Sequence, residues 1–89
     1  MVERRVQIIN KLGLHARAAA KFVKTASTFS SKIIVQKDGM EVDGKSILGV
    51  LMLAASRGTN LVLRATGRDE EAAIEAMESL ITSRFGERE

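Results

Sequence analysis

Alternating apolar and polar residues predict four strands along the chain. The first, Arg4–Ile9, places Val6 and Ile8 on one face and polar side chains on the other, which is the period of a half-buried strand. Asp38-Gly39 is a strong signal for a two-residue hairpin turn, so the second and third strands should pair antiparallel. These two strands and the fourth are Lys32–Lys37, Met40–Asp43 and Leu61–Thr66.

Apolar residues at helical spacing predict three helices. In Ala16–Ser27 they form one stripe, with the basic side chains away from it, as in an amphipathic surface helix. Ile47–Ala54 follows Ser46, a residue type favoured at the N-cap, and we expect Gly58 to take the left-handed conformation that ends this helix. Asp69–Arg84 has acidic residues in its first turn and a basic residue at its end, which suits the helix macrodipole. The residues expected to face the core from the first and last helices are Ala19, Phe22, Val23, Ala26, Ala73, Ile74, Met77, Leu80 and Ile81.

The predicted elements follow the order β-α-β-β-α-β-α along 89 residues. A chain of this length makes one domain, residues 1–89, with no room for a second core. A short hairpin within this mixed order predicts an α+β fold, in which an antiparallel sheet carries helices on one face. Only Gly86–Glu89 is expected to be a frayed tail.

Composition and charge exclude several classes of protein. The chain has no Cys, which excludes disulfides and thiolate metal sites, and its acidic residues do not gather near the single His, so we expect no metal site. The 14 Lys+Arg against 11 Asp+Glu give a formal charge of only +3, and the 3 Phe are the only aromatic residues that could stack on bases. We therefore expect no nucleic-acid partner. The longest apolar run, Ile47–Ala55, is too short to span a bilayer, so we expect no membrane insertion and a cytoplasmic location.

His15, the only histidine, lies at the start of the first predicted helix, within Gly13-Leu14-His15-Ala16-Arg17. A surface histidine near a helix start is the plain structural interpretation. However, a helix start offers free backbone N–H groups and a partial positive charge, and Arg17 lies in the same turn. This combination suits a phosphoryl group carried on the ring, because a neutral ring nitrogen can attack phosphorus and the donors can hold the dianionic product.

The segment Gly13–Arg17, followed by an Ala-rich helix, resembles the active-site segment of the HPr family. This family comprises the histidine-containing phosphocarriers of the bacterial phosphoenolpyruvate-dependent phosphotransferase system. The resemblance extends from Val2 to about Ser83 and includes Lys45–Val50 and the Gly67–Glu71 start of the last helix. It implies an open-faced β-sandwich, with a four-stranded antiparallel sheet covered by three helices.

The resemblance also implies a function and its partners. His15 would be phosphorylated on Nδ1, and Ala16 and Arg17 would bind the phosphoryl group. The chain would accept this group from phosphorylated enzyme I and pass it to a histidine of enzyme IIA, with no cofactor or metal. It would be modified stoichiometrically in each cycle, which makes it a carrier rather than a true enzyme, and we expect a monomer.

One position departs from the family pattern, since Ala18 stands where the family usually has Pro. Pro in a first helical turn lacks an N–H that would be unpaired anyway, and it presets φ. Ala18 keeps the helix and adds one free donor near the phosphate, so we expect it to be tolerated. The branch of the family to which the chain belongs stays open at this point.

Ser46 has two interpretations. As an N-cap it needs only its hydroxyl. By resemblance, Lys45–Val50 is similar to the regulatory serine segment of HPr proteins that are phosphorylated by a dedicated HPr kinase/phosphorylase. Ser46 would then be a regulatory phosphorylation site.

The predicted helix Ile47–Ala54 is apolar on every side, and a helix in so small a domain cannot readily bury all its faces. One interpretation is a fully buried core helix. The other is a docking patch for partner proteins, which in the HPr family is shared with the first helix. The residues expected to form this patch are Ala16, Ala20, Lys24, Ile47, Leu48, Leu51 and Met52.

Three functional alternatives follow from these patterns. The favoured one is a phosphocarrier of the sugar phosphotransferase system. A carrier of the nitrogen-related branch would relay phosphate for regulation only. An interaction module that signals through the apolar helix would need no chemistry at His15, and the presence of both His15 and Arg17 argues against it.

Overall fold

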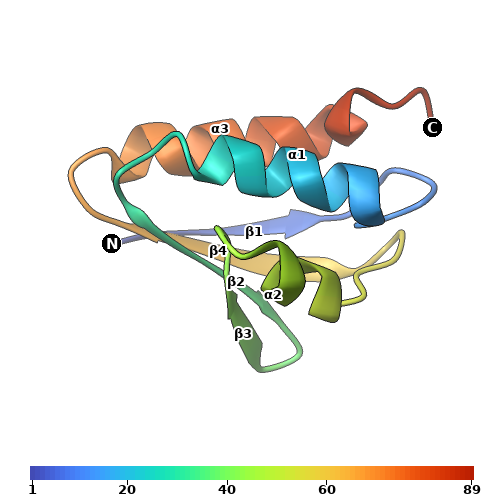
Figure 1. Cartoon of the computed structure of the whole chain (residues 1–89), viewed down its shortest axis with the longest axis horizontal. Coiled ribbons are helices and arrows are strands. Elements are labelled where there is room, and N and C mark those ends of the chain that lie inside the picture. The colour runs from blue at the N-terminus through green and yellow to red at the C-terminus, as the bar shows by residue number, and fades with distance from the viewer.

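The computed structural model describes residues 1–89 and has the element order expected from the sequence (Figure 1). The strands form one four-stranded antiparallel sheet, and the helices cover one face of it, which confirms the expected α+β open-faced fold. The helices and strands are β1 (Val2–Gln7), α1 (Ala16–Ala26), β2 (Lys32–Lys37), β3 (Met40–Asp43), α2 (Ile47–Met52), β4 (Asn60–Thr66), α3 (Glu70–Thr82) and the short 3-10 helix η1 (Arg84–Gly86).

The sheet has the strand order β1-β4-β2-β3, so β4 lies between the first two strands of the chain. Val35 of β2 pairs with Leu63 of β4 on one side and with Val42 of β3 on the other. β1 begins at Val2 rather than Arg4, because Val2 already pairs with Ala65 of β4. Side chains on one face of these strands point to the helices, which is the half-buried pattern that alternation predicts.

The core lies between the sheet and the helices α1 and α3, which run side by side (Figure 1). The apolar stripes of both helices face it, except that Val23 and Leu80 are only half-buried at its edge. Ala18 is fully buried, and α1 includes it without interruption. Ala18 therefore occupies the first turn as a packing residue.

The second helix is shorter than predicted and ends at Met52. Leu53 and Ala54 donate their N–H groups to carbonyls three residues back, which tightens the chain as it leaves the helix. Leu53 and Ala55 enter the core, and Ala54 between them takes the left-handed conformation, with φ +48°. The expectation that Gly58 ends this helix is wrong, because Gly58 takes its positive φ of +91° in the later turn before β4.

The C-terminal segment departs most from the prediction. α3 ends at Thr82 rather than Arg84, and η1 then turns Phe85 into the core, where it is 1% exposed. Arg84 and Phe85 take left-handed backbone, with φ +59° and +55°, to make this turn. The Phe85 carbonyl also accepts a hydrogen bond from Nζ of Lys21 at 2.7 Å. Burial of one large aromatic ring thus ends the helix early. In place of a frayed tail, Gly86–Glu89 has defined contacts with the β1–α1 loop.

Candidate functional site

His15 is the N-cap residue of α1 and lies on the loop that follows β1. Its backbone is extended, with φ −70° and ψ 176°, and its Nδ1 accepts the backbone N–H of Arg17 at 3.3 Å. Gly13 makes this loop possible, because its φ is +64° and a Cβ there would lie 2.4 Å from the carbonyl oxygen of Ala55. The Leu14 N–H donates to the same carbonyl at 2.8 Å. The loop that carries the ring is therefore packed against the segment after α2.

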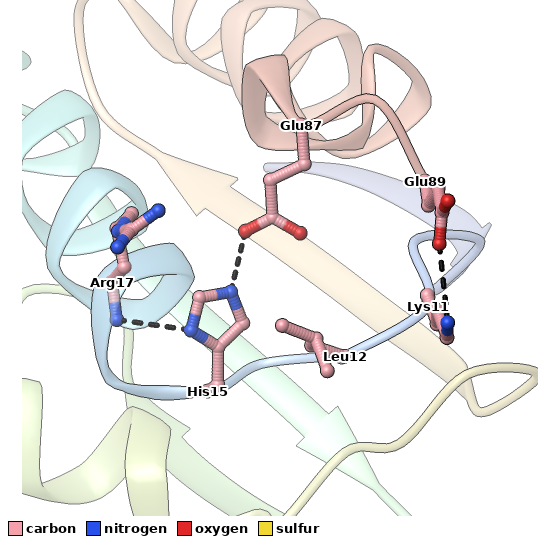
Figure 2. A pocket seen from close by; sticks show the side chains of 6 residues that line it. All are labelled: Lys11, Leu12, His15, Arg17, Glu87 and Glu89. Carbon is pink, nitrogen blue, oxygen red and sulfur yellow. Dashed lines mark hydrogen bonds and ion pairs between the residues drawn. The ribbon is translucent and has the colours of Figure 1, made fainter.

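Glu87 is a site residue that sequence reasoning missed. Its Oε2 contacts Nε2 of His15 (Figure 2). Its Oε1 accepts a hydrogen bond from Nδ2 of Asn10 at 3.0 Å. The His15 and Glu87 side chains are 26% and 16% exposed, so the pair is largely shielded. The two residues are 72 positions apart, and the tail was expected to be frayed. No local signal in the sequence pointed to this contact.

Burial and hydrogen bonding act in opposite directions on the Glu87 carboxyl. Burial is the largest effect and by itself would raise the pKa, while the hydrogen bonds from His15 and Asn10 lower it. The net result is that the pKa of Glu87 lies below its ordinary value of 4.5. Glu87 is therefore a carboxylate at neutral pH and can accept the hydrogen bond from His15.

Asn10 connects the two sides of the site. Its side chain is fully buried, and Nδ2 donates to the carbonyl of Gly13 at 2.8 Å as well as to Glu87. One amide group thereby joins the loop that carries His15 to the tail that carries Glu87. The sequence indicated a loop at Asn10–Gly13, but it did not single out this side chain.

The contacts at the two ring nitrogens indicate which nitrogen carries the proton when the His15 ring is neutral. Nδ1 accepts an N–H and must carry the lone pair, so the proton of the neutral ring is on Nε2, where Glu87 accepts it. The lone pair of Nδ1 therefore faces the backbone N–H groups at the start of α1. A group bonded to Nδ1 would meet the same donors.

Arg17 and Ala16 lie in the first turn of α1, and both side chains are exposed. The first turn holds no acidic residue, so nothing in it opposes an anion. An open cavity of about 400 Å³ surrounds the ring (Figure 2). The residues that line it are Lys11, Leu12, His15, Arg17, Glu87 and Glu89. The imidazole, the guanidinium and the helix start thus share one solvent-open site, which can hold a phosphoryl group and its charge.

Ser46 is the N-cap residue of α2, as its position in the sequence predicts. Its Oγ accepts the backbone N–H of Gly49 at 3.1 Å. Gly49 also lies close to β3, because a Cβ there would be 3.2 Å from Cβ of Val42. The hydroxyl of Ser46 is half-buried and belongs to a different helix start from that of His15.

The interpretation of the second helix as fully buried is wrong. Within α2 only Val50 is buried, and Leu53 follows it into the core. Ala16, Ala20 and Lys24 on neighbouring α1 are also exposed, as is Leu12 in the loop before it, which was not predicted. The four apolar side chains of α2 that reach solvent are Ile47 at 43%, Leu48 at 68%, Leu51 at 36% and Met52 at 65%. Exposed apolar side chains therefore occur on both α1 and α2, which pack against each other.

Two further findings bear on the chemistry. The chain holds no group of three or more His, Cys, Asp or Glu side chains arranged to bind a metal ion. None of its helices combines the length and the apolar character needed to cross a membrane.

Comparison with known proteins places the chain among close relatives. Residues 2–83 match a family model described as the PTS HPr component phosphorylation site. Phosphocarrier protein HPr of Neisseria meningitidis is 51% identical over 89 residues, with both chains covered completely. Phosphocarrier protein HPr of Pseudomonas aeruginosa is 52% identical over 85 residues, which is 94% of each chain.

Solved structures agree with these relatives. HPr-C-His from Thermoanaerobacter tengcongensis superposes with a TM-score of 0.97 at 53% identity and full coverage of both chains. Crh of Bacillus subtilis, which crystallised as a dimer with a swapped domain, has a TM-score of 0.76 at 42% identity over 94% of this chain and 97% of its own. The family model and the full-length identity with HPr proteins lead to one conclusion: the chain belongs to the HPr family, the phosphocarrier proteins of the phosphotransferase system.

Proposed function

We propose that this phosphocarrier accepts a phosphoryl group on Nδ1 of His15 from phosphorylated enzyme I and passes it to a histidine of enzyme IIA. The observation that carries the proposal is the position of Nδ1, whose lone pair faces the backbone N–H groups at the start of α1 beside Arg17. This is the nitrogen to which the family resemblance assigns the phosphoryl group. The site needs no metal for this step, because both partners are nitrogen nucleophiles that exchange one group.

The proposed acceptance step balances in atoms and charge. The lone pair of Nδ1 attacks phosphorus, the bond between phosphorus and the donor's nitrogen breaks, and that electron pair returns to the donor ring. The proton on Nε2 stays in place, so the ring of His15 becomes positively charged and carries a dianionic phosphoryl group. The backbone N–H of Arg17 then donates to a phosphoryl oxygen instead of to Nδ1. The Arg17 guanidinium adds a charge-assisted contact to the phosphoryl group. Passage to enzyme IIA reverses these movements.

We propose that enzyme I and enzyme IIA dock on the surface formed by the exposed faces of α1 and α2. Exposed apolar side chains on two neighbouring helices of a small domain are typical of a protein-binding surface. Arg17 and Lys24 at its border would attract acidic partners and speed encounter. The residues of the proposed surface are Ala16, Ala20, Lys24, Ile47, Leu48, Leu51 and Met52.

We also propose Ser46 as a regulatory phosphorylation site, the substrate of an HPr kinase/phosphorylase. A phosphate adds about −1.5 to −2 charges, which would stand at the border of the apolar patch next to Ile47 and Leu48. An acidic partner attracted by Arg17 and Lys24 would be repelled by it. The carrier itself is proposed to act in the cytoplasm as a monomer.

Two other roles compete with this proposal. A carrier of the nitrogen-related branch would use the same His15 chemistry, so only its partners would differ. A module without phosphoryl chemistry would leave His15 unmodified. The ring at the edge of an open cavity, the Nδ1 that accepts an N–H and the absence of acidic residues from the first turn of α1 favour a phosphocarrier over such a module.

Labelling with phosphoenolpyruvate and enzyme I tests the proposal. The wild-type chain should gain one acid-labile phosphate, and a second incubation with enzyme IIA should remove it. His15→Ala should gain none while keeping its circular dichroism spectrum. Labelling of His15→Ala at the wild-type level would exclude His15 as the acceptor. A correctly folded wild-type chain that stays unlabelled would favour the module.

A further inference from the structure

Glu87 holds His15 in a way that the proposed function leaves unexplained. The ring makes two polar contacts, one at each nitrogen. At Nδ1 the N···N distance of 3.3 Å is longer than the usual range for a strong hydrogen bond. At Nε2 the contact with the Glu87 carboxylate is close and largely shielded from solvent. Glu87 is therefore the main polar contact that sets the orientation of the ring.

Glu87 is itself fixed from several sides. Its Oε1 accepts a hydrogen bond from the buried amide of Asn10, and its backbone N–H donates to the carbonyl of Arg84 at 2.9 Å. Before it in the chain, Phe85 is buried in the core. After it, the backbone oxygen of Glu89 accepts the backbone N–H of Lys11 at 2.5 Å. Because the chain is anchored both before and after Glu87, the Glu87 carboxylate is held in place next to the ring.

We propose that Glu87 is a positioning residue for His15, which accepts the Nε2–H and thereby directs the unprotonated Nδ1 towards the incoming phosphorus. The proposal rests on phosphoryl transfer at His15 and adds a role for a residue at the far end of the chain. Glu87 does not touch the reacting atoms, because it contacts the opposite nitrogen of the ring (Figure 2).

The positive charge that develops on the His15 ring during transfer gives Glu87 a second role. Attack by Nδ1 leaves the ring positively charged while the proton remains on Nε2. The carboxylate of Glu87 faces that proton, so the contact becomes an ion pair and strengthens as the new bond to phosphorus forms. The phosphoryl group lies at Nδ1, so the ring separates the two negative groups. Glu87 thus stabilises the phosphorylated ring more than the free one.

Glu75 provides a control outside the site. It is exposed on α3 and does not line the cavity around His15. Glu87→Ala and Glu75→Ala each remove one negative charge from the chain. Glu87→Gln keeps an oxygen that can accept the Nε2–H but removes the charge, so it separates orientation from charge. All three variants retain Phe85, the residue that anchors the tail in the core.

The test combines two readouts. In the unphosphorylated protein, the proton NMR signal of the His15 Nε2–H should be visible and protected from exchange, which is unambiguous because the chain has 1 His. Glu87→Ala should lose this protection, and Glu75→Ala should keep it. In rapid-quench assays with phosphorylated enzyme I, Glu87→Ala should be slower than wild type by about tenfold, as for a lost charge-assisted hydrogen bond. Glu87→Gln should fall between wild type and Glu87→Ala, and Glu75→Ala should match wild type.

Several outcomes would overturn the proposal while leaving phosphoryl transfer at His15 intact. Equal transfer rates for Glu87→Ala and Glu75→Ala would remove Glu87 from the mechanism. A faster Glu87→Ala would mean that the tail obstructs the site. Should Glu87→Ala melt at a much lower temperature, the isosteric Glu87→Gln decides, because loss of the Nε2–H protection at an unchanged transfer rate in that variant would leave Glu87 only a structural role. Failure of the proposed function would appear differently, as a wild-type chain that accepts no phosphate.

Discussion

The helices α1 and α2 both begin with a side-chain N-cap, but the two cap residues differ in their chemistry. Each helix begins after an N-cap residue with extended backbone, His15 before α1 and Ser46 before α2. Each cap side chain accepts a backbone N–H from the first turn, from Arg17 at 3.3 Å and from Gly49 at 3.1 Å. Serine is among the best N-cap residues, whereas histidine is not favoured there. Only the histidine has a second polar atom, and that atom contacts Glu87.

The difference shows how a reactive group can be built from a common structural motif. A hydroxyl satisfies a helix start with little else required of its surroundings. An imidazole in the same position makes a longer, weaker cap, but it places a nucleophilic lone pair where free N–H groups can receive an anion. The second nitrogen of the ring contacts the C-terminal tail, through Glu87.

The largest expected effect comes from making the start of α1 resemble that of α2. His15→Asn replaces a weak cap by one of the best, so the free energy of unfolding should stay within about 1 kcal/mol of wild type. Phosphoryl acceptance should be abolished, because an amide nitrogen has no available lone pair. Chemical denaturation and labelling with phosphorylated enzyme I check the two parts. Acid-labile phosphate on this variant would show that the acceptor lies elsewhere.

Adding charge to the other helix start should slow transfer without harming the fold. Ser46→Asp places one negative charge beside Ile47 and Leu48 on the proposed docking surface, so acceptance from enzyme I should fall several-fold and less steeply at high salt. Asp is also a good N-cap, so the melting temperature should not fall. Ser79→Asp is the matched control, because Ser79 is exposed on α3. Equal slowing in both variants would assign the effect to net charge and remove Ser46 from the docking surface.

Removing the cap of α2 should lower the stability of the fold and leave the transfer rate unchanged. Ser46→Ala loses the hydrogen bond to the Gly49 N–H, which should lower the free energy of unfolding by about 1 kcal/mol. Transfer from enzyme I should stay at the wild-type rate, because the hydroxyl takes no part in it. Urea denaturation and rapid-quench kinetics measure the pair of effects. Ser79→Ala provides the control for loss of a serine hydroxyl within a helix, and it should cause no comparable loss.

The start of α3 offers a third case with a smaller, pH-dependent effect. Asp69 precedes this helix but makes no side-chain bond to it. Its carboxylate instead contacts Oγ of Ser31 and accepts the backbone N–H groups of Ser30 and Ser31, both at 2.9 Å. The hydroxyl of Ser31, followed by the N–H of Ser30, lowers the pKa of Asp69 from 3.8 to about 2.

The sign of the pH effect follows from this lowered pKa. As the pH falls, the unfolded chain binds a proton at Asp69 at a higher pH than the folded chain does. The stability contributed by the carboxylate is therefore complete above pH 4 and is lost between about pH 4 and pH 2. Thermal melts across this range should show a shallower decline for Asp69→Asn than for wild type, because Asn does not titrate. Parallel curves for the two proteins would mean that other carboxylates account for the acid transition.

Residues close together in the chain determined much of this protein. Alternation along β2 and β3 and the turn at Asp38-Gly39 predict the hairpin that the structure contains. Helical spacing predicts α1 and α3, and Ser46 predicts its own cap. The cluster at His15 and Arg17 is also local, since both residues belong to one helix start. Periodicity and capping depend on neighbours within a few positions, so a single sequence can reveal them.

Only the tertiary structure decided what completes the site. Glu87 reaches His15 across 72 positions, and Asn10 joins the two because the tail returns to the β1–α1 loop. The tail returns because Phe85 enters the core, which ends α3 earlier than its helical pattern indicates. Contacts between distant segments depend on how the core is filled, and they leave no periodic mark on either segment. His15 was therefore visible in the sequence as a candidate site residue, while the carboxylate that contacts its ring was set by packing alone.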